Sequence, residues 1–377
     1  MGVSMIKVMT LFGTRPEAIK MAPLVKALEN DSEIESIVCV TAQHREMLDQ
    51  VLELFHITPN YDLNIMKSGQ SLSEITSRVL MGVEEVLKEA QPDIVLVHGD
   101  TSTTLSGALA AFYRQIPVGH VEAGLRSGNP YSPYPEEMNR MLTTKLSAIH
   151  FAATEGNVDN LLKEGINAET IVKTGNTVID ALKSVIKDDY IFESPVLNAI
   201  DFHARKVITM TAHRRENLGA PMENIFRAIR TIVEENDTVE LVFPVHLNPV
   251  VRNVAMKYFS NHERIHLIEP LAYEAFANLL GRSYLILTDS GGIREEAPAL
   301  GKPVIVLRTE TERPEAVDAG TVLIAGVEYD AVYKMTTDLI LDSNMYRKMS
   351  EAVNPYGDGA ACARIVNYIK KSFGSLF

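Results

Sequence analysis

The chain of 377 residues contains two cysteines and no tryptophan. Cys39 and Cys362 stand far apart, so the sequence has neither a disulfide framework nor the paired spacing of a zinc site. No apolar run approaches the ~20 residues that cross a bilayer, and residues 1–8 lack the charged and long apolar segments of a secretion signal. These absences favour a protein of the reducing cytoplasm with no membrane partner.

Positive charge is also scarce, since 36 basic residues face 49 acidic ones and the formal net charge is −13 at pH 7. This balance disfavours a general attraction to nucleic acid or anionic lipid. Any anionic ligand must therefore be held by local groups.

The chain does contain short β-branched runs that alternate with longer stretches of helical period. Its length suggests two domains. The runs of the first half are 6–11, 37–41, 94–98, 117–121, 149–153 and 171–174. A second set comprises 207–211, 239–244, 265–268, 285–288, 303–307 and 322–324. The segment 187–202 lies between the sets, contains Pro195 and has no clean period, so we interpret it as an interdomain linker.

The pattern predicts two doubly wound α/β domains with parallel sheets, residues 1–186 and 203–358. A helix at 360–373 follows, and by its apolar face it fits either domain. In such sheets, ligands bind beyond the carboxyl ends of the strands, so the residues that directly follow each run are the candidates for ligand contacts.

The first strand of each half leads into basic residues. In the segment 13–20, glycine permits close approach and Arg15 and Lys20 are suited to phosphate beside a helix N-terminus. This segment is neither a G-x-G-x-x-G nor a G-x-x-x-x-G-K-[ST] loop, and an ordinary turn with a solvated Arg15 is the alternative. In the second half, His213, Arg214 and Arg215 follow the first strand and His246 follows the second, where positive groups could meet a diphosphate. Structural ion pairing of these arginines is the alternative there.

Acidic side chains follow the third and fourth strands of the first half. Asp100 and Glu122 emerge at neighbouring strand ends, and Glu136 and Glu137 come shortly after in a Pro-rich loop. Three acids converging on one cleft would shift one another's pKa, which suits proton transfer to and from a substrate. The alternative for Asp100 is a helix N-cap, and for Glu137 we predict a solvated face.

Two histidines next to these acids raise the question of a metal. His98 and His120 end β-runs, where hydrogen-bonded structural histidines are more common than ligands, so we expect no metal.

The segment 288–298 runs from a strand end into a helix with small residues at its start. Ser290 can cap the helix, and the free N–H groups of 290–292 with the helix dipole favour phosphate. Glu296 lies where a carboxylate can accept from ribose hydroxyls, and a plain capped helix is the alternative. A nucleotide on the second domain and a carboxylate-rich pocket on the first together indicate a nucleotide-sugar enzyme.

The whole chain resembles the non-hydrolysing bacterial UDP-N-acetylglucosamine 2-epimerases. The matching segments are GTRPEAIK at 13–20, HGDT at 98–101, HVEAGLRS at 120–127, PEEMNR at 135–140, HRREN at 213–217, TDSGGIREEAP at 288–298 and TERPEAV at 311–317. The resemblance implies a glycosyltransferase-B-like fold of two Rossmann-like domains, with the active-site cleft between them, residues 359–377 crossing back to the first domain, and a homodimer.

The resemblance also implies a reaction without a nicotinamide or any other cofactor. The family interconverts UDP-GlcNAc and UDP-ManNAc by eliminating UDP to give 2-acetamidoglucal and adding UDP back with protonation at the other face of C2. The product supplies ManNAc for cell-surface polysaccharides.

Site roles carry over by motif. The implied catalytic residues are Asp100, Glu122, Glu136 and His213. The implied substrate-binding residues are Arg15, Lys20, Leu271, Phe276, Ser290, Gly291, Gly292, Glu296 and Arg313. A second UDP-GlcNAc acts as activator in the family, and its implied contacts are Gln43, Gln70, Arg214 and His246.

Three other functions share parts of this pattern. A hydrolysing epimerase would release free ManNAc and UDP, and a glycosyltransferase would need an acceptor and has less obvious use for three acids. A nucleotide-sugar sensor would bind without turnover and would not need Asp100, Glu122 and Glu136.

Overall fold

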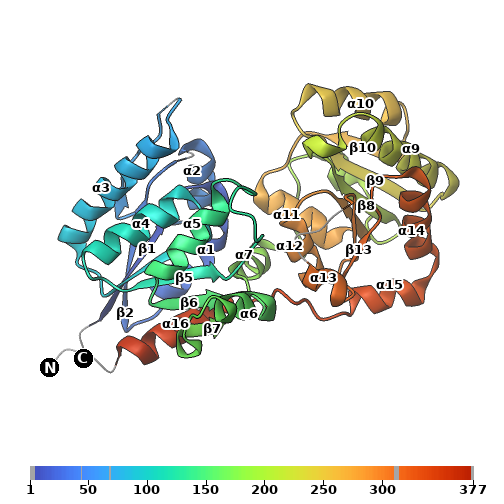
Figure 1. Cartoon of the computed structure of the whole chain (residues 1–377). Helices are drawn as coiled ribbons and strands as arrows, with labels where there is room; N and C mark the ends of the chain where they lie inside the picture. Colours follow the sequence, from blue (N-terminus) through green and yellow to red (C-terminus); the bar gives the residue numbers. More distant parts are fainter. Residues whose placement is uncertain (1–4, 44, 68, 310–313, 375–377) are drawn as a thin grey trace. The chain divides into compact units, whose positions relative to one another are not determined.

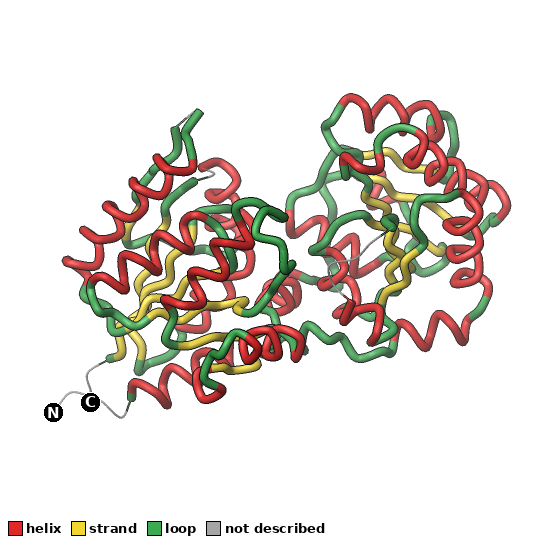
Figure 2. Tube along the Cα trace, in the orientation of Figure 1, coloured by secondary structure: helices red, strands yellow, loops and turns green. Residues whose placement is uncertain are grey.

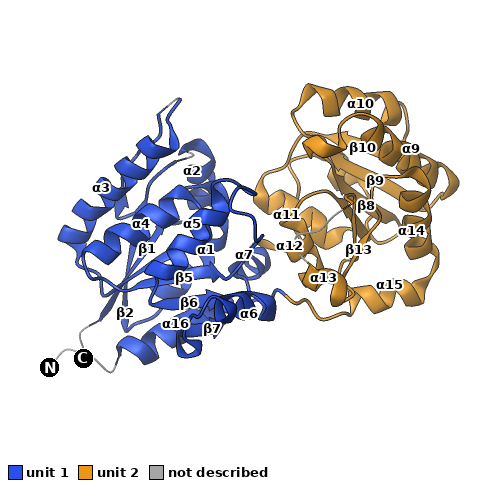
Figure 3. Ribbon diagram, in the orientation of Figure 1, with its two compact units in different colours: residues 1–184, 356–377 blue, residues 185–355 orange. Residues whose placement is uncertain are grey.

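The computed structural model describes residues 5–43, 45–67, 69–309 and 314–374 (Figure 1). The chain divides into two compact units (Figure 3). Unit 1 comprises Met1–Ser184 and Tyr356–Phe377, and unit 2 comprises Val185–Pro355. None of the described helices combines the length and the apolar composition needed to cross a membrane.

Within the described residues, unit 1 contains a seven-stranded parallel sheet in the order β3-β2-β1-β4-β5-β6-β7. Its strands are β1 (Ile6–Phe12), β2 (Ile34–Val40), β3 (Tyr61–Asp62), β4 (Ile94–His98), β5 (Val118–Ala123), β6 (Ile149–Ala152) and β7 (Ile171–Lys173). Its helices are α1 (Arg15–Glu29), α2 (Arg45–Leu54), α3 (Leu72–Ala90), α4 (Ser102–Tyr113), α5 (Glu136–Leu146), α6 (Glu155–Lys163), the 3-10 turn η1 (Ala168–Thr170), α7 (Thr177–Val185) and α16 (Ala361–Phe373).

Unit 2 contains, in the part of the chain that is described, a six-stranded parallel sheet in the order β10-β9-β8-β11-β12-β13. Its strands are β8 (Lys206–Thr211), β9 (Val239–Pro244), β10 (Ile265–Ile268), β11 (Leu285–Thr288), β12 (Val304–Val306) and β13 (Val322–Ile324). Its helices are α8 (Pro195–Ala199), the 3-10 turn η2 (Arg215–Asn217), α9 (Ala220–Glu235), α10 (Pro249–Phe259), α11 (Tyr273–Arg282), α12 (Ile293–Ala299), α13 (Pro314–Asp318), α14 (Tyr329–Leu341) and α15 (Ser343–Ser350).

The central strands are buried on both faces, which explains their continuous β-branched runs. Every residue of Ile94–Val97 is fully buried in β4, and helices flank each sheet (Figure 2). A strand that is covered on both sides by crossover helices needs apolar side chains at every position rather than at alternate ones. The predicted α/β class with two parallel sheets is therefore confirmed, and each of the twelve predicted runs overlaps a strand.

Both sheets reverse their strand order between the first and fourth strands of the unit. In unit 1 the reversal lies between β1 and β4, and in unit 2 between β8 and β11. Ligand sites of open α/β sheets form at the carboxyl ends of these strands, because the loops there diverge to opposite faces. The residues that follow β1, β4, β8 and β11 therefore occupy the favoured position in each unit.

The segment 187–202, which the sequence pattern indicates as a linker, packs on unit 2. Phe192 and Leu197 are buried in a cluster with Val207, Val242 and Leu279. Aromatic and aliphatic side chains at irregular spacing give no helical or strand period, yet they bury apolar area against β8, β9 and α11. The segment is thus an ordered part of unit 2 and not a free connection.

The helix α16 belongs to unit 1. Lys370 on α16 forms an ion pair of 3.0 Å with Asp31, just beyond α1, and the Tyr368 ring packs edge-on against Phe151 of β6. The connection back to unit 1 begins at Tyr356, whose carbonyl accepts a hydrogen bond of 2.7 Å from the Asn176 N–H. Unit 1 therefore resumes three residues before the predicted position 359.

Candidate active site

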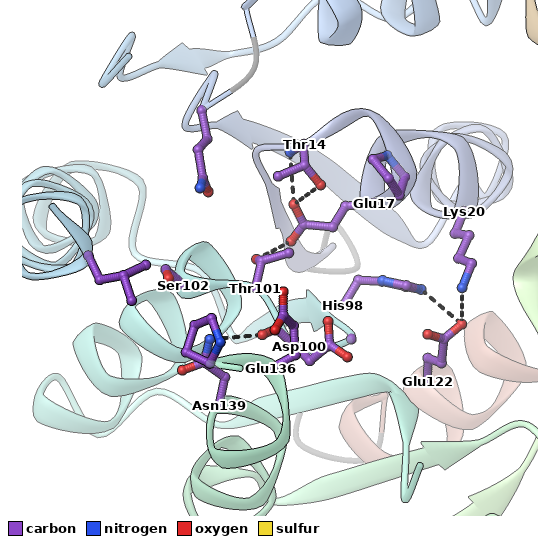
Figure 4. A pocket seen from close by; sticks show the side chains of 15 residues that line it. Thr14, Glu17, Lys20, His98, Asp100, Thr101, Ser102, Glu122, Glu136 and Asn139 are labelled. Atoms are coloured by element: carbon purple, nitrogen blue, oxygen red, sulfur yellow. Dashed lines mark hydrogen bonds and ion pairs between the residues drawn. The ribbon is translucent and has the colours of Figure 1, made fainter. Parts of the chain in front are cut away.

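A cavity of about 440 Å³ opens at the carboxyl ends of β1, β4 and β5 in unit 1 (Figure 4). Its lining residues are Thr14, Pro16, Glu17, Lys20, Gln43, Leu72, His98, Gly99, Asp100, Thr101, Ser102, Glu122, Pro135, Glu136 and Asn139. Five of the site residues implied by the sequence therefore meet in one place, namely Lys20, Gln43, Asp100, Glu122 and Glu136. The other two implied site residues of unit 1, Arg15 and Gln70, are not part of this lining.

Glu122 reaches the cavity through an irregularity in its strand. Its φ is +63°, and β5 shifts register against β6 at this residue. A bulge of this kind turns a side chain away from its regular direction. The Glu122 carboxylate forms an ion pair with Lys20 Nζ, accepts a hydrogen bond of 3.0 Å from Asn176 Nδ2, and lies 3.7 Å from His98 Nε2.

Asp100 is not a helix cap. Thr101 is the N-cap of α4 and accepts from the Thr104 N–H, so the Asp100 side chain is left to face the cavity, where it forms an ion pair with Arg140. Burial raises the pKa of Asp100, the Glu122 charge adds to the rise, and Arg140 opposes it. The raised pKa makes proton exchange at this carboxyl easier near neutral pH.

The neighbouring acids Glu136 and Glu137 have different environments. Glu136 begins α5 and lines the cavity, and its Oε2 is buried with no hydrogen-bond partner among the described residues. Glu137 is fully buried, accepts from the N–H groups of Ser127 and Gly128, and pairs with Arg140 at 3.0 Å. The prediction of a solvated face for Glu137 is therefore wrong, because its carboxylate is buried against the N–H groups of Ser127 and Gly128 and against Arg140.

Glu17 is a cavity residue that the sequence analysis missed. Its buried carboxylate accepts hydrogen bonds from the Gly13 and Thr14 N–H groups and from the hydroxyls of Thr101 and Thr104. Burial raises the pKa of Glu17. The hydrogen bonds from Gly13, Thr14 and Thr101 lower it, but burial is the larger effect. One side chain thus joins the loop after β1 to the loop after β4, and the T-x-x-E spacing of a capping box was the signal available for it.

His98 and His120 are buried next to the acids. Burial lowers the pKa of His98 to about 4 and that of His120 to about 3. The His120 Nε2 lies 2.7 Å from the Gly99 carbonyl oxygen, so the neutral ring donates there and supports the loop that carries Asp100. This geometry agrees with the structural role predicted for His120.

In unit 2, the loop after β8 is attached to the loop after β11 through Asp289. The Asp289 Oδ2 accepts hydrogen bonds of 2.8 Å from the N–H groups of both His213 and Arg214, and its Oδ1 lies 3.1 Å from His213 Nδ1. Burial alone would raise the pKa of Asp289, but the hydrogen bonds from His213 and Arg214 lower it. The carboxylate therefore stays ionised and fixes the His213 ring, which stacks on His246 with centroids 5.6 Å apart.

The start of α12 differs from the expectation in one respect. Gly292, and not Ser290, is the N-cap of α12, and this cap has no side-chain hydrogen bond. The Ser290 N–H donates to Thr288 Oγ1 at 2.9 Å. Glu296 is buried in α12. The pKa of Tyr273 is raised, first because Tyr273 is buried and second because the Glu296 carboxylate lies next to it.

The remaining predicted residues have simpler surroundings. Leu271 and Phe276 are half-buried at the start of α11, Arg15 is partly exposed at the start of α1, and Gln70 Nε2 donates to the Ile65 carbonyl. Arg313 lies outside the described residues.

Comparison with known proteins identifies the family of the chain. The family model described as UDP-N-acetylglucosamine 2-epimerase matches residues 26–370. The chain belongs to this family. A UDP-N-acetylglucosamine 2-epimerase of Bacillus subtilis is 58% identical over 98% of this chain and 96% of its own.

Solved structures of the family superpose over nearly the whole chain. An epimerase structure from Listeria monocytogenes has a TM-score of 0.94 and 54% identity, covering 99% of this chain and 98% of its own. A UDP-GlcNAc 2-epimerase from Neisseria meningitidis, bound to UDP-GlcNAc, has a TM-score of 0.85 and 52% identity, covering 97% and 100%. The predicted glycosyltransferase-B-like fold is confirmed by this agreement in architecture.

Proposed function

We propose that this epimerase-family chain interconverts UDP-GlcNAc and UDP-ManNAc by eliminating and re-adding UDP. The observation that carries the proposal is the unit 1 cavity, which is lined by Asp100 from the loop after β4, Glu122 from β5 and Glu136 from the start of α5. Inversion at C2 requires a proton to leave one face of the sugar and return to the other. More than one carboxyl group is therefore useful, and a simple glycosyl transfer to an acceptor has no such need.

The chemistry follows from this set of acids. A carboxylate takes the C2 proton, the C1–O bond breaks, and its electron pair leaves with UDP, which gives the C1=C2 bond of 2-acetamidoglucal. In the return step, a carboxylic acid delivers a proton to the opposite face of C2 and the UDP oxygen attacks C1. Asp100, with its raised pKa, is suited to hold a proton, and Glu122 is paired with Lys20.

Unit 2 contributes the groups for UDP in this proposal. Negative charge grows on the diphosphate as the C1–O bond breaks, and preorganised donors stabilise it. We assign His213 to this role, with Asp289 as the residue that holds its ring. Ser290, Gly291 and Gly292 are proposed to contact phosphate and Glu296 the ribose, while Leu271 and Phe276 are assigned to the uracil.

The decisive experiment is incubation of metal-free protein with UDP-GlcNAc in D₂O without acceptor or nicotinamide, with products followed by proton NMR. Deuterium at C2 together with new UDP-ManNAc supports elimination and re-addition. Free ManNAc plus UDP would identify a hydrolysing epimerase. Intact, undeuterated substrate would favour the glycosyltransferase or the sensor.

A second UDP-GlcNAc is proposed as activator, held by Gln43, Gln70, Arg214 and His246. Gln43 lines the carboxylate cavity and His246 stacks on His213, so these two proposed contact groups adjoin proposed catalytic groups. UDP-ManNAc alone should then react slowly, and traces of UDP-GlcNAc should accelerate it. A hyperbolic response without such acceleration would contradict the activator.

We also propose a homodimer formed through unit 1. Apolar side chains are exposed on three adjacent helices: Met81 on α3, Phe112 and Tyr113 on α4, and Met138 and Leu142 on α5 (Figure 1). Exposed apolar groups on neighbouring elements are typical of a protein interface. Light scattering should give twice the chain mass of 41.7 kDa, and Phe112→Glu should reduce it to the monomer value.

A further inference from the structure

A second cavity, of about 630 Å³, lies in unit 2 away from the site residues described so far. It is formed by the segment 186–203, by α11 and by the turn before β12. Lys302 comes from that turn, at the amino end of β12, whereas Asp289 and Ser290 follow the carboxyl end of β11. Because these strands are parallel, the cavity lies at the amino ends of the strands, and the proposed UDP groups lie at their carboxyl ends.

Most charged groups in the lining already have partners. Lys187 Nζ pairs with Glu274 at 2.7 Å. The Arg282 guanidinium donates to the carbonyls of Asp188 and Tyr190 and lies over the Phe192 ring. Asp201 Oδ1 accepts from two backbone N–H groups.

Lys302 is different. No hydrogen bond or ion pair to its ammonium is present among the described residues, although the side chain is only partly exposed and lines the cavity. Burial lowers the pKa of Lys302, and no neighbouring acid opposes that shift. A partly desolvated charge without a partner is unfavourable, so an anion that enters the cavity gains a charge-assisted contact that water provides less well.

We propose that this cavity binds a small monocarboxylate that carries an apolar group, with the carboxylate on Lys302. A monoanion fits because, among the described residues, Lys302 is the one lysine or arginine of this lining whose charged group has no partner, and Asp188 and Asp201 elsewhere in the lining disfavour a second negative charge. Ile186, Ile200 and Phe202 provide the apolar wall. The ligand would hold the segment 186–203 against α11 and the turn before β12.

The test uses the full chain with saturating UDP, so that the proposed nucleotide groups are occupied. Benzoate is the probe, and its binding is followed by saturation-transfer NMR and calorimetry. Lys302→Met removes the charge at similar length, and Lys302→Arg retains it. Lys334→Met, at an exposed lysine of α14 that pairs with Asp338, is the matched control.

We expect Lys302→Met to weaken benzoate binding at least about tenfold, and Lys302→Arg and Lys334→Met to stay within about threefold of the unmodified chain. Without benzoate, the thermal midpoint of Lys302→Met should be no lower than that of the unmodified chain, because the substitution removes a partly buried charge that has no partner. Phenyl phosphate, a dianion, should bind more weakly than benzoate.

Three results would overturn the proposal. They are no benzoate binding by the unmodified chain up to about 5 mM, equal binding by Lys302→Met, or equal binding of neutral benzyl alcohol. Failure of benzoate to bind leaves UDP binding and epimerisation unaffected, so this outcome is distinct from failure of the proposed function.

Discussion

Acid should destabilise unit 1 through the buried ring of His120. The ring is fully buried, its Nε2 contacts the Gly99 carbonyl, and its Nδ1 is buried with no hydrogen-bond partner among the described residues. Protonation at Nδ1 would therefore put a positive charge on a buried ring, and the new N–H would have no acceptor. The folded-state pKa is about 3, against about 6.5 in the unfolded chain.

The sign and size follow from proton linkage. Between pH 6.5 and 3 the unfolded chain binds a proton at His120 and the folded chain does not, so stability falls as the pH falls through this window. At pH 5 the loss relative to pH 8 is RT ln(1 + 10^1.5), about 2 kcal/mol. At pH 8 the contribution is fully present.

The assay compares the unmodified chain with His120→Gln, whose amide can still donate to Gly99 but does not titrate. Because the chain has no tryptophan, Tyr368→Trp in both proteins provides a single tryptophan beside Phe151 in unit 1, which can be excited selectively. Urea unfolding at pH 8, 7, 6 and 5 should show the stability difference between the two proteins shrink by about 2 kcal/mol. His203→Gln, at an exposed histidine of unit 2, is the control. Parallel pH dependences of the unmodified chain and the His120→Gln variant would refute the reasoning.

Three further outcomes are expected. Asp100→Asn or Glu122→Gln should lower turnover by about 10²-fold or more while UDP affinity in calorimetry is largely kept, and retained turnover would contradict their assignment. Asp289→Asn should lower kcat about 10²-fold, because the His213 ring loses its anionic partner, and unchanged kcat would remove Asp289 from the proposal. Gly124→Ala should cost about 2–4 kcal/mol of unfolding free energy, since φ is +90° and a Cβ would lie 2.3 Å from the Asn157 carbonyl oxygen. Gly128→Ala, also at positive φ but with open space, should cost only about 1 kcal/mol, and equal losses would show that the contact is unimportant.

The sequence by itself determined every described strand except β3, and it determined the positions of the acids along the chain. Runs such as Ile94–His98 are apolar nearly throughout because both faces of a parallel strand are covered, so composition alone locates them. The two-residue strand β3 was missed because Tyr61–Asp62 is too short to show a period. The order of the motifs along the chain was also sufficient to recognise the family.

Only the tertiary structure decided what each acid contacts. Glu136 and Glu137 are adjacent in the chain, but the rotation of α5 places one at the cavity and the other against the buried Arg140. The direction of Glu122 depends on a bulge between β5 and β6, two strands that a whole helix separates in the chain. Such contacts arise from packing between distant segments, and local spacing carries no information about them. The same reason explains why the segment 187–202 has no sequence period and still folds onto unit 2.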